Sequence, residues 1–509
     1  MSQLTNFSGG LNTRYTPHLI SIDQSVKCEN VNPSAISLKP MADDDDELQN
    51  FGANSSFFYF AGAWIARSGA TDYVEFQDVL YYSDGISIPQ KTVDGTNFYN
   101  VGITTPTTKP TVVANDAVDP DNKDVRQYCY TYYNANDTTE SVPSPYSLEL
   151  DVSTDNVDIS GFIASTDTQV THIRIYRLGG NLSNMTLVAS IANTVPQTYT
   201  DISSDLDIAS EHQLDSFNAG QALAGLLFLT EYNAMLFGAI DDKLYYSEVG
   251  KPNEWSAFSF LDFDYPITGL GATQNGLLVF TKSRTHLITG NAPAALNKVL
   301  IHASQGCINH KTIKYVDNLL IWLSQDGLCT SNGGSVQVIT LDKLDKLVVT
   351  SLDAEILDNQ YYLFHNTETL VVDFRYGPPT FRTIDLIANG AWYSEQFDRL
   401  YYVDVLGNLY SLGRGESTRT YNYKTGRLTE GSISNLKNYR TIYVYILGTA
   451  EMKSYIDGVL VSTINLTNGQ NEVKLPQQKR QGYYIEFEFT GTGEVLEVEY
   501  KLEGRQNGR

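Results

Sequence analysis

The stretch NAMLFGAIDDKLYYSE at residues 233–248 contains the pattern that decides the fold of this chain. A pivot residue, Asn or Asp, begins the phrase, and a short apolar run, a turn and a second run follow it. The phrase recurs as NGLLVFTKSRTHLITG from Asn275, DNLLIWLSQDGLCTSNGG from Asp317, DNQYYLFHNTETLVVDF from Asp358 and DRLYYVDVLGNLYSLG from Asp398. Successive pivots are 42, 42, 41 and 40 residues apart. Each phrase predicts two strands with room for two more before the next, which is typical of a four-stranded propeller blade.

An earlier phrase, QDVLYYSDGISIPQ, has its pivot at Asp78. Asp78 lies 155 residues before Asn233. Removal of one period of about 40 residues leaves roughly 115 inserted residues. Six pivots predict an all-β fold with about six propeller blades, divided between residues 42–106 and 216–415. Because propellers commonly close their ring with a borrowed strand, the N-terminal arm is a candidate to complete one blade.

The insert and the C-terminus each predict a separate β-sandwich. Residues 107–215 contain short alternating strands between turn residues, and this stretch resembles a fibronectin type III module through its ESVPSP segment, its IRIYR strand and its exit at Tyr199 and Asp201. Residues 416–509 contain longer alternating strands with an Asp457-Gly458 hairpin signal. The chain therefore divides into an arm, two propeller parts, an insert and a final sandwich.

Two segments depart from the strand pattern. The arm at residues 1–41 is irregular and reads as a strand or arm that pairs elsewhere, and the acidic run Asp43–Glu47 that follows it predicts an exposed loop. This run lacks the alternating ligands and the central Gly of an EF-hand loop, so a calcium site is the lesser alternative. The clearest helical period lies around Thr340 to Leu357.

Composition narrows the function. The formal net charge is −24 with a pI of about 4.6, which argues against a surface that grips phosphates. The small basic clusters, at Lys479 with Arg480 and between Arg414 and Arg427, favour solvated faces. Four widely spaced cysteines without zinc-site spacing predict reduced thiols in a protein that folds in a cytoplasm. We expect neither a signal peptide nor a membrane span.

Motifs for catalysis are weak. The phrase SQDGLCTS from Ser324 approaches a sialidase-type Asp box but has its Gly one place early and no Trp. No GxSxG, HExxH or P-loop motif occurs, and His286, His302 and His310 lack metal-ligand spacing. The four Trp residues lie in or beside the blade phrases, where core packing is favoured over sugar stacking. We therefore expect a protein that is not an enzyme and has no cofactor and no metal site.

Several phrases in order resemble the nozzle or tail-hub proteins of short-tailed bacteriophages. These are the opening FSGGLNTRYTPHLI, the ESVPSP and IRIYR segments and above all residues 243–290, where S-x-x-G-x-P-x-x-W ends at Trp255 and precedes a blade that ends at Gly290. The resemblance covers most of the chain. The chain is shorter than the larger nozzles and has no evident extra domain for fibre docking, so fibre attachment and the hub of needle-bearing tails both remain open.

The resemblance implies a structural virion protein assembled in the host bacterial cytoplasm. Six copies would form a ring beneath the adaptor under the portal, with tail fibres or a tail needle as further partners, and the ring would close the tail before infection and conduct double-stranded DNA during ejection without binding it tightly. An acidic wall would repel passing DNA. Candidates for such a wall are Asp241, Asp242, Asp262 and Asp264, with ordinary solvent exposure as the alternative. The rival classes are a tail adhesin that binds or cleaves host glycans and a cellular propeller scaffold.

Overall fold

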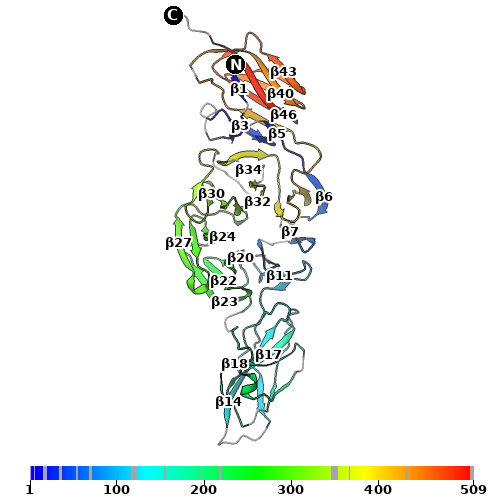
Figure 1. Ribbon diagram of the computed structural model, residues 1–509, viewed down its shortest axis with the longest axis vertical. Coiled ribbons are helices and arrows are strands. Elements are labelled where there is room, and N and C mark those ends of the chain that lie inside the picture. The colour runs from blue at the N-terminus through cyan, green and yellow to red at the C-terminus, as the bar shows by residue number, and fades with distance from the viewer. Residues whose placement is uncertain are drawn as a thin grey trace.

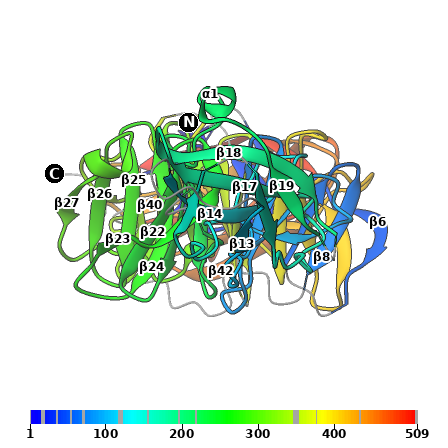
Figure 2. The same cartoon turned by 90° about the horizontal axis from the view of Figure 1, so that it is seen from below.

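The computed structural model describes a nearly all-β protein with three bodies in a line (Figure 1). The described residues are 2–4, 6–14, 20–33, 37–52, 56–67, 72–115, 123–153, 156–194, 197–216, 220–345, 353–365, 367–375, 377–431 and 434–504. Sheets surround a common centre in the middle of the molecule, with a sandwich of N- and C-terminal strands on one side and the insert on the opposite side. Figure 2, viewed from the insert, shows the blades spread behind it.

Six four-stranded units form the propeller, and the all-β propeller fold predicted from the repeat is confirmed. Blade A contains β9 (Asp72–Phe76), β10 (Val79–Ser83), β11 (Gln90–Thr92) and β12 (Tyr99–Asn100); blade B contains β20 (Leu227–Tyr232), β21 (Met235–Ile240), β22 (Lys243–Glu248) and β23 (Lys251–Asp262); blade C contains β24 (Ile267–Thr273), β25 (Gly276–Thr281), β26 (Thr285–Thr289) and β27 (Asn297–His302). Blade D contains β28 (Lys314–Val316), β29 (Leu319–Ser324), β30 (Gly327–Ser331) and β31 (Gln337–Val338); blade E contains β32 (Asp353–Leu357), β33 (Gln360–Phe364), β34 (Thr369–Asp373) and β35 (Thr380–Ile384); blade F contains β36 (Gly390–Ser394), β37 (Arg399–Val403), β38 (Asn408–Ser411) and β6 (Asp45–Asn50). Neighbouring blades meet through their first strands, which therefore surround the centre.

The pivots fall in equivalent turns, between the first and second strand of each blade, as the repeat predicts. Tight two-residue hairpins of this kind need positive φ at their central positions, which Asn and Asp tolerate better than most residues. The pair Asp317-Asn318 has φ values of 46° and 63°, and Asp358-Asn359 has 51° and 55°. Five of the six pivots, all but Asn275, have positive φ, so the recurring pivot is a residue that this turn geometry favours.

A seventh position in the ring holds only half a blade. The strands β7 (Ser56–Phe60) and β8 (Ala63–Arg67) form a two-stranded sheet joined by a turn at Ala61-Gly62, with φ values of 49° and 86°. This hairpin packs between blades F and A, where Phe58 contacts Tyr73 and Trp64 contacts Trp392, at ring-centroid distances of 5.3 Å each. The pivot pattern did not reveal this position because it lacks a full blade length of sequence.

The acidic run is part of the ring closure, and the prediction of an exposed loop is wrong. Residues from Asp45 onward form β6, which pairs with β38 and completes blade F. The carboxylate of Asp44 is 5% exposed and binds the guanidinium of Arg419. It also accepts a hydrogen bond from the hydroxyl of Tyr402 at 2.6 Å. The borrowed strand comes from the segment directly after the arm. Arg419, which is 375 residues away in the chain, neutralises Asp44, while Asp45 and Asp46 are exposed on the strand.

The helical period around Thr340 to Leu357 includes residues 346–352, which lie outside the described residues. Among the described residues of this stretch, 340–345 form turns and 353–357 form β32, the first strand of blade E. Ala354 is fully buried there. The last five residues of the stretch are therefore a strand inside the ring and not a helix.

The arm and the C-terminus build one sandwich. The arm supplies β1 (Ser2–Leu4), β2 (Gly10–Leu11), β3 (Gln24–Glu29), β4 (Val31–Pro33) and β5 (Leu38–Pro40); the C-terminus supplies β39 (Tyr421–Thr425), β40 (Lys437–Leu447), β41 (Ala450–Ile456), β42 (Val459–Leu466), β43 (Gly469–Lys474), β44 (Gln481–Gly482), β45 (Ile485–Gly491) and β46 (Glu494–Gly504). Strand β3 pairs with β35 of blade E on one edge and with β39 on the other. The propeller and the sandwich therefore share a sheet.

The insert is a second sandwich. One sheet contains β13 (Thr111–Ala114), β16 (Val157–Ser160) and β19 (Tyr199–Asp201), and the other contains β15 (Leu150–Val152), β14 (Asp124–Tyr133), β17 (His172–Gly179) and β18 (Leu182–Ala192). The two sheets bury a common core that includes Tyr130, Ile159 and Ile175. The one α-helix of the described residues, α1 (Asp205–Ile208), follows β19.

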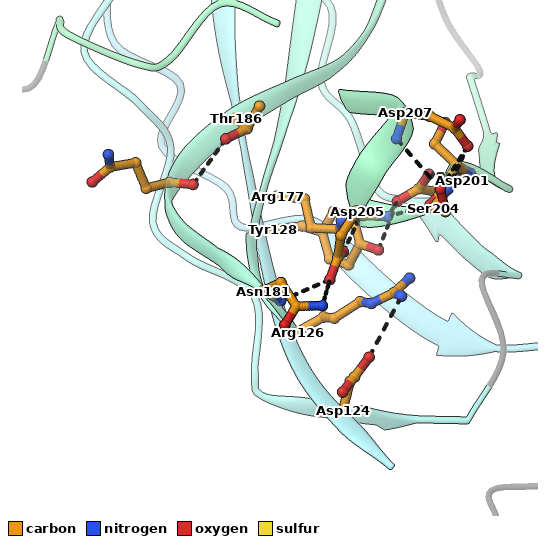
Figure 3. A network of polar contacts seen from close by, with 12 residues as sticks. Asp124, Arg126, Tyr128, Arg177, Asn181, Thr186, Asp201, Ser204, Asp205 and Asp207 are labelled. Carbon is orange, nitrogen blue, oxygen red and sulfur yellow. Dashed lines mark hydrogen bonds and ion pairs between the residues drawn. The ribbon is translucent and has the colours of Figure 1, made fainter. Parts of the chain in front are cut away.

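A buried ion pair ties this helix to the insert (Figure 3). The guanidinium of Arg177 is fully buried and contacts the carboxylates of Asp201 at 2.7 Å and Asp205 at 2.8 Å. The hydroxyl of Tyr128 donates to Asp201 at 2.9 Å. Buried charges persist where they are paired in this way.

The ESVPSP segment pairs with β14 by an unusual spacing. The amide nitrogens of Ser141, Ser144 and Ser147 donate to carbonyl oxygens on β14 at 2.8 to 2.9 Å. Their hydroxyls accept hydrogen bonds from backbone amides of the same strand at 2.9 to 3.0 Å. Serines at every third position thus supply hydrogen-bond partners for the backbone amide and carbonyl groups of every second residue of β14. The residues between the serines make none of these bonds, so prolines, which have no backbone N–H, can stand there.

Candidate functional site

A cleft of about 900 Å³ lies where the insert meets blades A and B. We call it the junction cleft. Its insert wall comes from the loop after β14, from β17 and from the segment after α1, and its propeller wall comes from the β9–β10 turn, β11 and the β22–β23 turn. Cavities between domains are common places for ligands and for relative motion.

Glu140 lies in the insert wall and is 5% exposed. Its carboxylate accepts hydrogen bonds from the hydroxyl of Tyr176 at 2.6 Å and from the hydroxyl of Thr131. The guanidinium of Arg174 donates to it at 2.9 Å, and Nε2 of His212 lies 3.8 Å away. Burial, together with the nearby Glu140 carboxylate, raises the pKa of Tyr176, so this hydroxyl stays protonated and continues to donate.

The propeller wall contains the S-x-x-G-x-P-x-x-W phrase. Gly250 occupies the β22–β23 turn at φ 71°, and the indole Nε1 of Trp255 donates to the carbonyl oxygen of Pro252 at 2.8 Å. The backbone of Trp255 pairs in both directions with Gly220, the residue at which the chain returns from the insert, with N to O distances of 2.6 and 3.0 Å. The phrase therefore clamps the end of the insert to the outer edge of blade B.

Close backbone packing also holds the start of the insert. Gly102 has φ 82°, and a Cβ atom at this position would lie 2.7 Å from Cα of Gln221 and 2.8 Å from the carbonyl oxygen of Asn253. Only glycine fits both the backbone conformation and the space. The two chain crossings between insert and propeller are thus pressed together at one edge of the cleft.

Ion pairs line the cleft. Lys91 of β11 contacts Asp137 of the insert at 2.5 Å. Lys251 contacts Glu254 at 3.1 Å and Asp215 of the insert at 3.4 Å. Burial raises the pKa of the Glu254 carboxyl even though Lys251 opposes the shift. Burial alone would lower the pKa of Lys251, but its bonds to Glu254 and Asp215 raise it overall.

Three phrases that are far apart in the sequence therefore converge here. ESVPSP supplies Glu140, IRIYR supplies Arg174 and Tyr176, and the Trp255 phrase supplies Lys251 and Glu254. No spacing rule links these positions, and the sequence did not predict a cleft. The sequence signal that connected these positions was that all three phrases belong to the same resemblance.

The proposed channel-wall residues form a separate group on blades B and C. Asp241 and Asp242 lie in the β21–β22 turn, and Asp262 and Asp264 lie at the end of blade B. The backbone joins them, since the carbonyl oxygens of Asp241 and Asp242 accept from the amides that begin and precede blade C. Asp262 binds Lys243, and Asp264 contacts Arg284 at 2.8 Å. The backbone thus joins the two segments that carry these residues, and Lys243 and Arg284 neutralise two of the four carboxylates locally.

The centre of the propeller is crossed by side chains at one end. Nε2 of His310, which precedes blade D, lies 3.1 Å from the carboxylate of Asp72 in blade A. Lys314 of blade D contacts Glu355 of blade E at 2.8 Å, and Asp353 accepts from the backbone amide of blade F at 3.1 Å. Burial raises the pKa of the Asp353 carboxyl. The His310 to Asp72 contact spans the ring, whereas the other two contacts join neighbouring blades.

The other candidates from the sequence, which are histidine, tryptophan and cysteine residues, pack inside the fold. His286 packs edge-on to Phe263 at 5.1 Å. Trp255 and Trp322 are buried inside blades. The four cysteines are unpaired and buried, and burial raises the pKa of the Cys28, Cys129 and Cys307 thiols to about 12.

Within the described ranges, no group of three or more His, Cys, Asp or Glu side chains is arranged to hold a metal ion. In the same part of the chain, no helix has the length and apolar character of a membrane span.

Neither protein-family models nor curated proteins match this chain. Among solved structures, the extracellular domain of a hybrid two component system from B. thetaiotaomicron aligns at 9% identity with a TM-score of 0.32, over 85% of this chain and 47% of that chain, so this chain spans about half of that domain's length. The designed protein Ika8 aligns at 9% identity with a TM-score of 0.31 over 81% of this chain and 98% of its own. Kluyveromyces lactis Hsv2 aligns at 12% identity with a TM-score of 0.28 over 80% of this chain and 99% of its own. By their descriptions, none of these three is a phage tail protein.

Proposed function

We propose that this chain is a structural subunit of the tail tip of a short-tailed bacteriophage, in which copies form a ring that closes and later opens a path for DNA. The observation that carries the proposal is the convergence of three of the four phrases of the resemblance at the junction cleft, while the opening phrase lies in the terminal sandwich. Phrases that are shared because of one architecture should meet where that architecture is held together. Here the Trp255 phrase joins the propeller to the insert through Lys251 and Asp215, and Glu140, Arg174 and Tyr176 hold together the facing wall of the insert.

The path for DNA lies between copies. The Asp72 and His310 side chains meet at 3.1 Å across one end of the propeller centre, which leaves no room for a duplex inside a single ring of blades. A conduit must then be enclosed by several chains. A net charge of −24 on each copy repels the phosphate backbone and lets a polymer pass without adhesion.

The architecture suits a ring with a movable part. Heterologous ring contacts need two different and complementary faces, which rigid sheets supply. The propeller and the terminal sandwich share both a sheet and a core and so form one rigid body. The insert is attached by two chain crossings and polar contacts, so it is the part that can turn when the tail opens.

Electron microscopy of the purified protein, alone and with the neighbouring tail proteins of its phage, tests this proposal. The free chain should be monomeric or weakly associated in low salt, since its net charge opposes self-association there. Rings of uniform symmetry should appear on the adaptor. A chain that never forms rings with any tail protein would contradict the proposal.

Duplex binding supplies a second test. The free protein should bind duplex DNA no more tightly than a non-specific Kd of about 10⁻⁴ M at physiological salt. Reversal of the charge of the Asp241, Asp242, Asp262 and Asp264 group should strengthen this binding if the group faces DNA. Salt-sensitive micromolar binding by the unmodified chain would instead indicate a protein that grips DNA.

The alternative is a tail adhesin that cleaves host glycans. Glycoside cleavage requires two carboxyl groups that flank the scissile bond at a suitable separation. Incubation with lipopolysaccharide and dextran, followed by an assay for reducing ends, separates the two functions. Release of sugar would contradict a purely structural role.

A further inference from the structure

The two lateral edges of the propeller differ in charge. Figures 1 and 2 place β27, the outer strand of blade C, at one side of the molecule, and β6 with the two-stranded position next to it at the opposite side. Residues 265–316, which include all of blade C, contain five Lys or Arg and no Asp or Glu. Residues 42–100, which include β6, β7, β8 and blade A, contain ten Asp or Glu and two Lys or Arg. We call the outer side of blade C the basic edge, and the side formed by β6, β7 and β8 the acidic edge.

Two cations of the basic edge are available to a partner. Lys282 and Lys298 are exposed, and no carboxylate contacts either of them within the described ranges. The ammonium of Lys298 donates to the backbone carbonyl oxygen of Asp262. Arg284, the third cation of blade C, is already paired with Asp264 at 2.8 Å. A carboxylate from another chain could therefore bind Lys282 or Lys298 without breaking an ion pair.

The backbone of the basic edge is open and partly apolar. Strand β27 pairs with β26 on one side and, among the residues that the structure describes, has no strand partner on the other. Val299 is 44% exposed and Leu300 is 47% exposed on this strand. An open edge strand with exposed apolar side chains is a ready template for contact with another chain.

The acidic edge has an opening in the ring of blades. Strands β7 and β8 fill only the inner half of the seventh position, whereas blades F and A on either side each have two further strands. In the described part of the chain, no strand pairs with the outer side of β8. The missing width is about 10 Å, since neighbouring strands lie about 4.8 Å apart. The outer side of another sheet could therefore cover this position.

Aromatic side chains gather at this opening. The ring of Trp64 on β8 lies 5.3 Å from the ring of Trp392 in blade F, and both side chains are half-buried. Phe397 is 41% exposed, and its ring lies 5.1 Å from that of Tyr59. Asp45 is exposed on β6, the outer strand of blade F. An aromatic centre beside a charged rim is the usual composition of a protein interface.

We propose that the basic edge of one copy docks at the acidic edge of the next, with β27 against the open seventh position, and that this contact joins the subunits of the ring. The two edges are different, complementary in charge and on opposite sides of the propeller, as a heterologous ring contact requires. The inference rests on the proposed ring function, but the contact itself can be measured between two free chains.

Cysteine cross-linking between two variants of the full-length chain tests the contact. One variant is Leu300→Cys on β27, and the other is Ala63→Cys at an exposed position of β8. Equal amounts are mixed with a short bismaleimide, with and without the neighbouring tail proteins, at physiological salt, where charges are screened beyond about 8 Å. The four native cysteines are buried and should not react. The mixture should give a cross-linked dimer, and each variant alone should give none.

Two matched controls accompany this experiment. Leu206→Cys places the reactive group on the insert, at a residue that is 86% exposed, and should not cross-link to the Ala63→Cys variant. For the charges, Lys298→Glu should weaken the association at least about tenfold, because it brings like charges together. Lys474→Glu changes a lysine of the terminal sandwich whose side chain is 77% exposed, and it should leave the association unchanged.

The outcomes separate this contact from the ring proposal. Rings seen by electron microscopy without a cross-link between the two edges would overturn the inference and leave the ring proposal standing. A cross-link between chains that form no ring would support the contact and contradict the ring. Cross-linking of the Leu300→Cys variant to itself would indicate a two-fold contact and overturn the inference, as would equal weakening by Lys298→Glu and Lys474→Glu. Absence of both rings and cross-links would overturn both proposals.

Discussion

The propeller is attached to its two neighbours in different ways. Toward the terminal sandwich, strand β3 joins two sheets, and one apolar core includes Phe7 of the arm, Tyr361 and Phe381 of blade E, and Tyr423 and Phe489 of the sandwich. Toward the insert, the contacts are ion pairs, amide hydrogen bonds and two chain crossings around an open cleft.

This difference separates a fused joint from a movable one. Apolar burial contributes about 25 cal/mol per Å² and is lost if the surfaces part, so a shared core resists rotation. The half-exposed pair of Lys251 with Asp215 contributes about 0–1 kcal/mol, whereas Lys91 is 6% exposed and would be left as a buried charge if its pair with Asp137 opened. The junction cleft is thus the place where the molecule can change shape at a lower cost than in the shared core.

Substitution Phe381→Ala should have the largest effect. Phe381 is 1% exposed in the shared core. Loss of a buried Phe side chain costs about 3–5 kcal/mol. Because the core is shared, the propeller and sandwich should lose stability together in denaturant unfolding. The control is Phe258→Ala, since Phe258 is 91% exposed and its loss should change stability by less than about 0.5 kcal/mol. Separate transitions for propeller and sandwich in the Phe381→Ala variant would show that the joint is not fused.

Substitution Asp201→Asn should act on the insert alone. It removes one of the two carboxylates from the fully buried Arg177, and an incompletely paired buried charge costs about 3 kcal/mol. Hydrogen exchange should accelerate in β14, β17 and α1 and stay unchanged in the blades. The exposed pair of Lys123 and Asp151 offers the control, since Lys123→Met should cost less than about 1 kcal/mol. Faster exchange throughout the propeller would contradict the separation of the two bodies.

The smallest expected effect is a pH dependence of opposite sign in the junction cleft and in blade E. Burial raises the pKa of the Glu254 carboxyl in the cleft, whereas for Asp373 in blade E burial is outweighed by hydrogen bonds from Arg375 and Gln360, which lower its pKa. The ordinary values are 4.5 for Glu254 and 3.8 for Asp373. A raised carboxyl pKa makes stability fall as pH rises from the ordinary pKa through the folded one. A lowered pKa gives stability that is present above the ordinary pKa and lost as pH falls through the folded one.

At pH 7, therefore, Glu254→Gln should leave stability unchanged or raise it slightly, while Asp373→Asn should lower it, each by less than about 1 kcal/mol. At a pH near 2 the difference between the two variants should shrink, because both carboxyls gain protons. Denaturant unfolding of both variants between pH 2 and pH 7 measures this difference in stability. A destabilised Glu254→Gln variant at neutral pH would reverse the assignment for the cleft.

The sequence predicted what local chemistry controls. The pivots were readable because Asn and Asp tolerate the positive φ that five of the six first turns have at the pivot, as at Asp358-Asn359. The Asp457-Gly458 hairpin between β41 and β42 was readable for the same reason. The conformational preference of these residues is local, so it can be predicted from the sequence alone.

Long-range contacts decided what the sequence did not reveal. The run around Asp44 resembles a loop until Arg419 neutralises it and β38 pairs with β6. The cleft depends on Glu140 and Lys251, which are over 100 residues apart and approach only after both bodies have folded. The seventh, two-stranded position escaped the period because its outer strands are missing from the described ring.

Deletion of the insert tests the contrast between the joints most directly. Residues 107–215 would be replaced by a short flexible linker, which leaves the Gly220 to Trp255 pairing and the shared core intact. We predict a folded protein with an unchanged cooperative unfolding transition for the propeller and sandwich, measured by circular dichroism and by resistance to proteolysis. Collapse of the propeller, or its unfolding at much lower denaturant, would contradict the account and show that the insert is part of the rigid body.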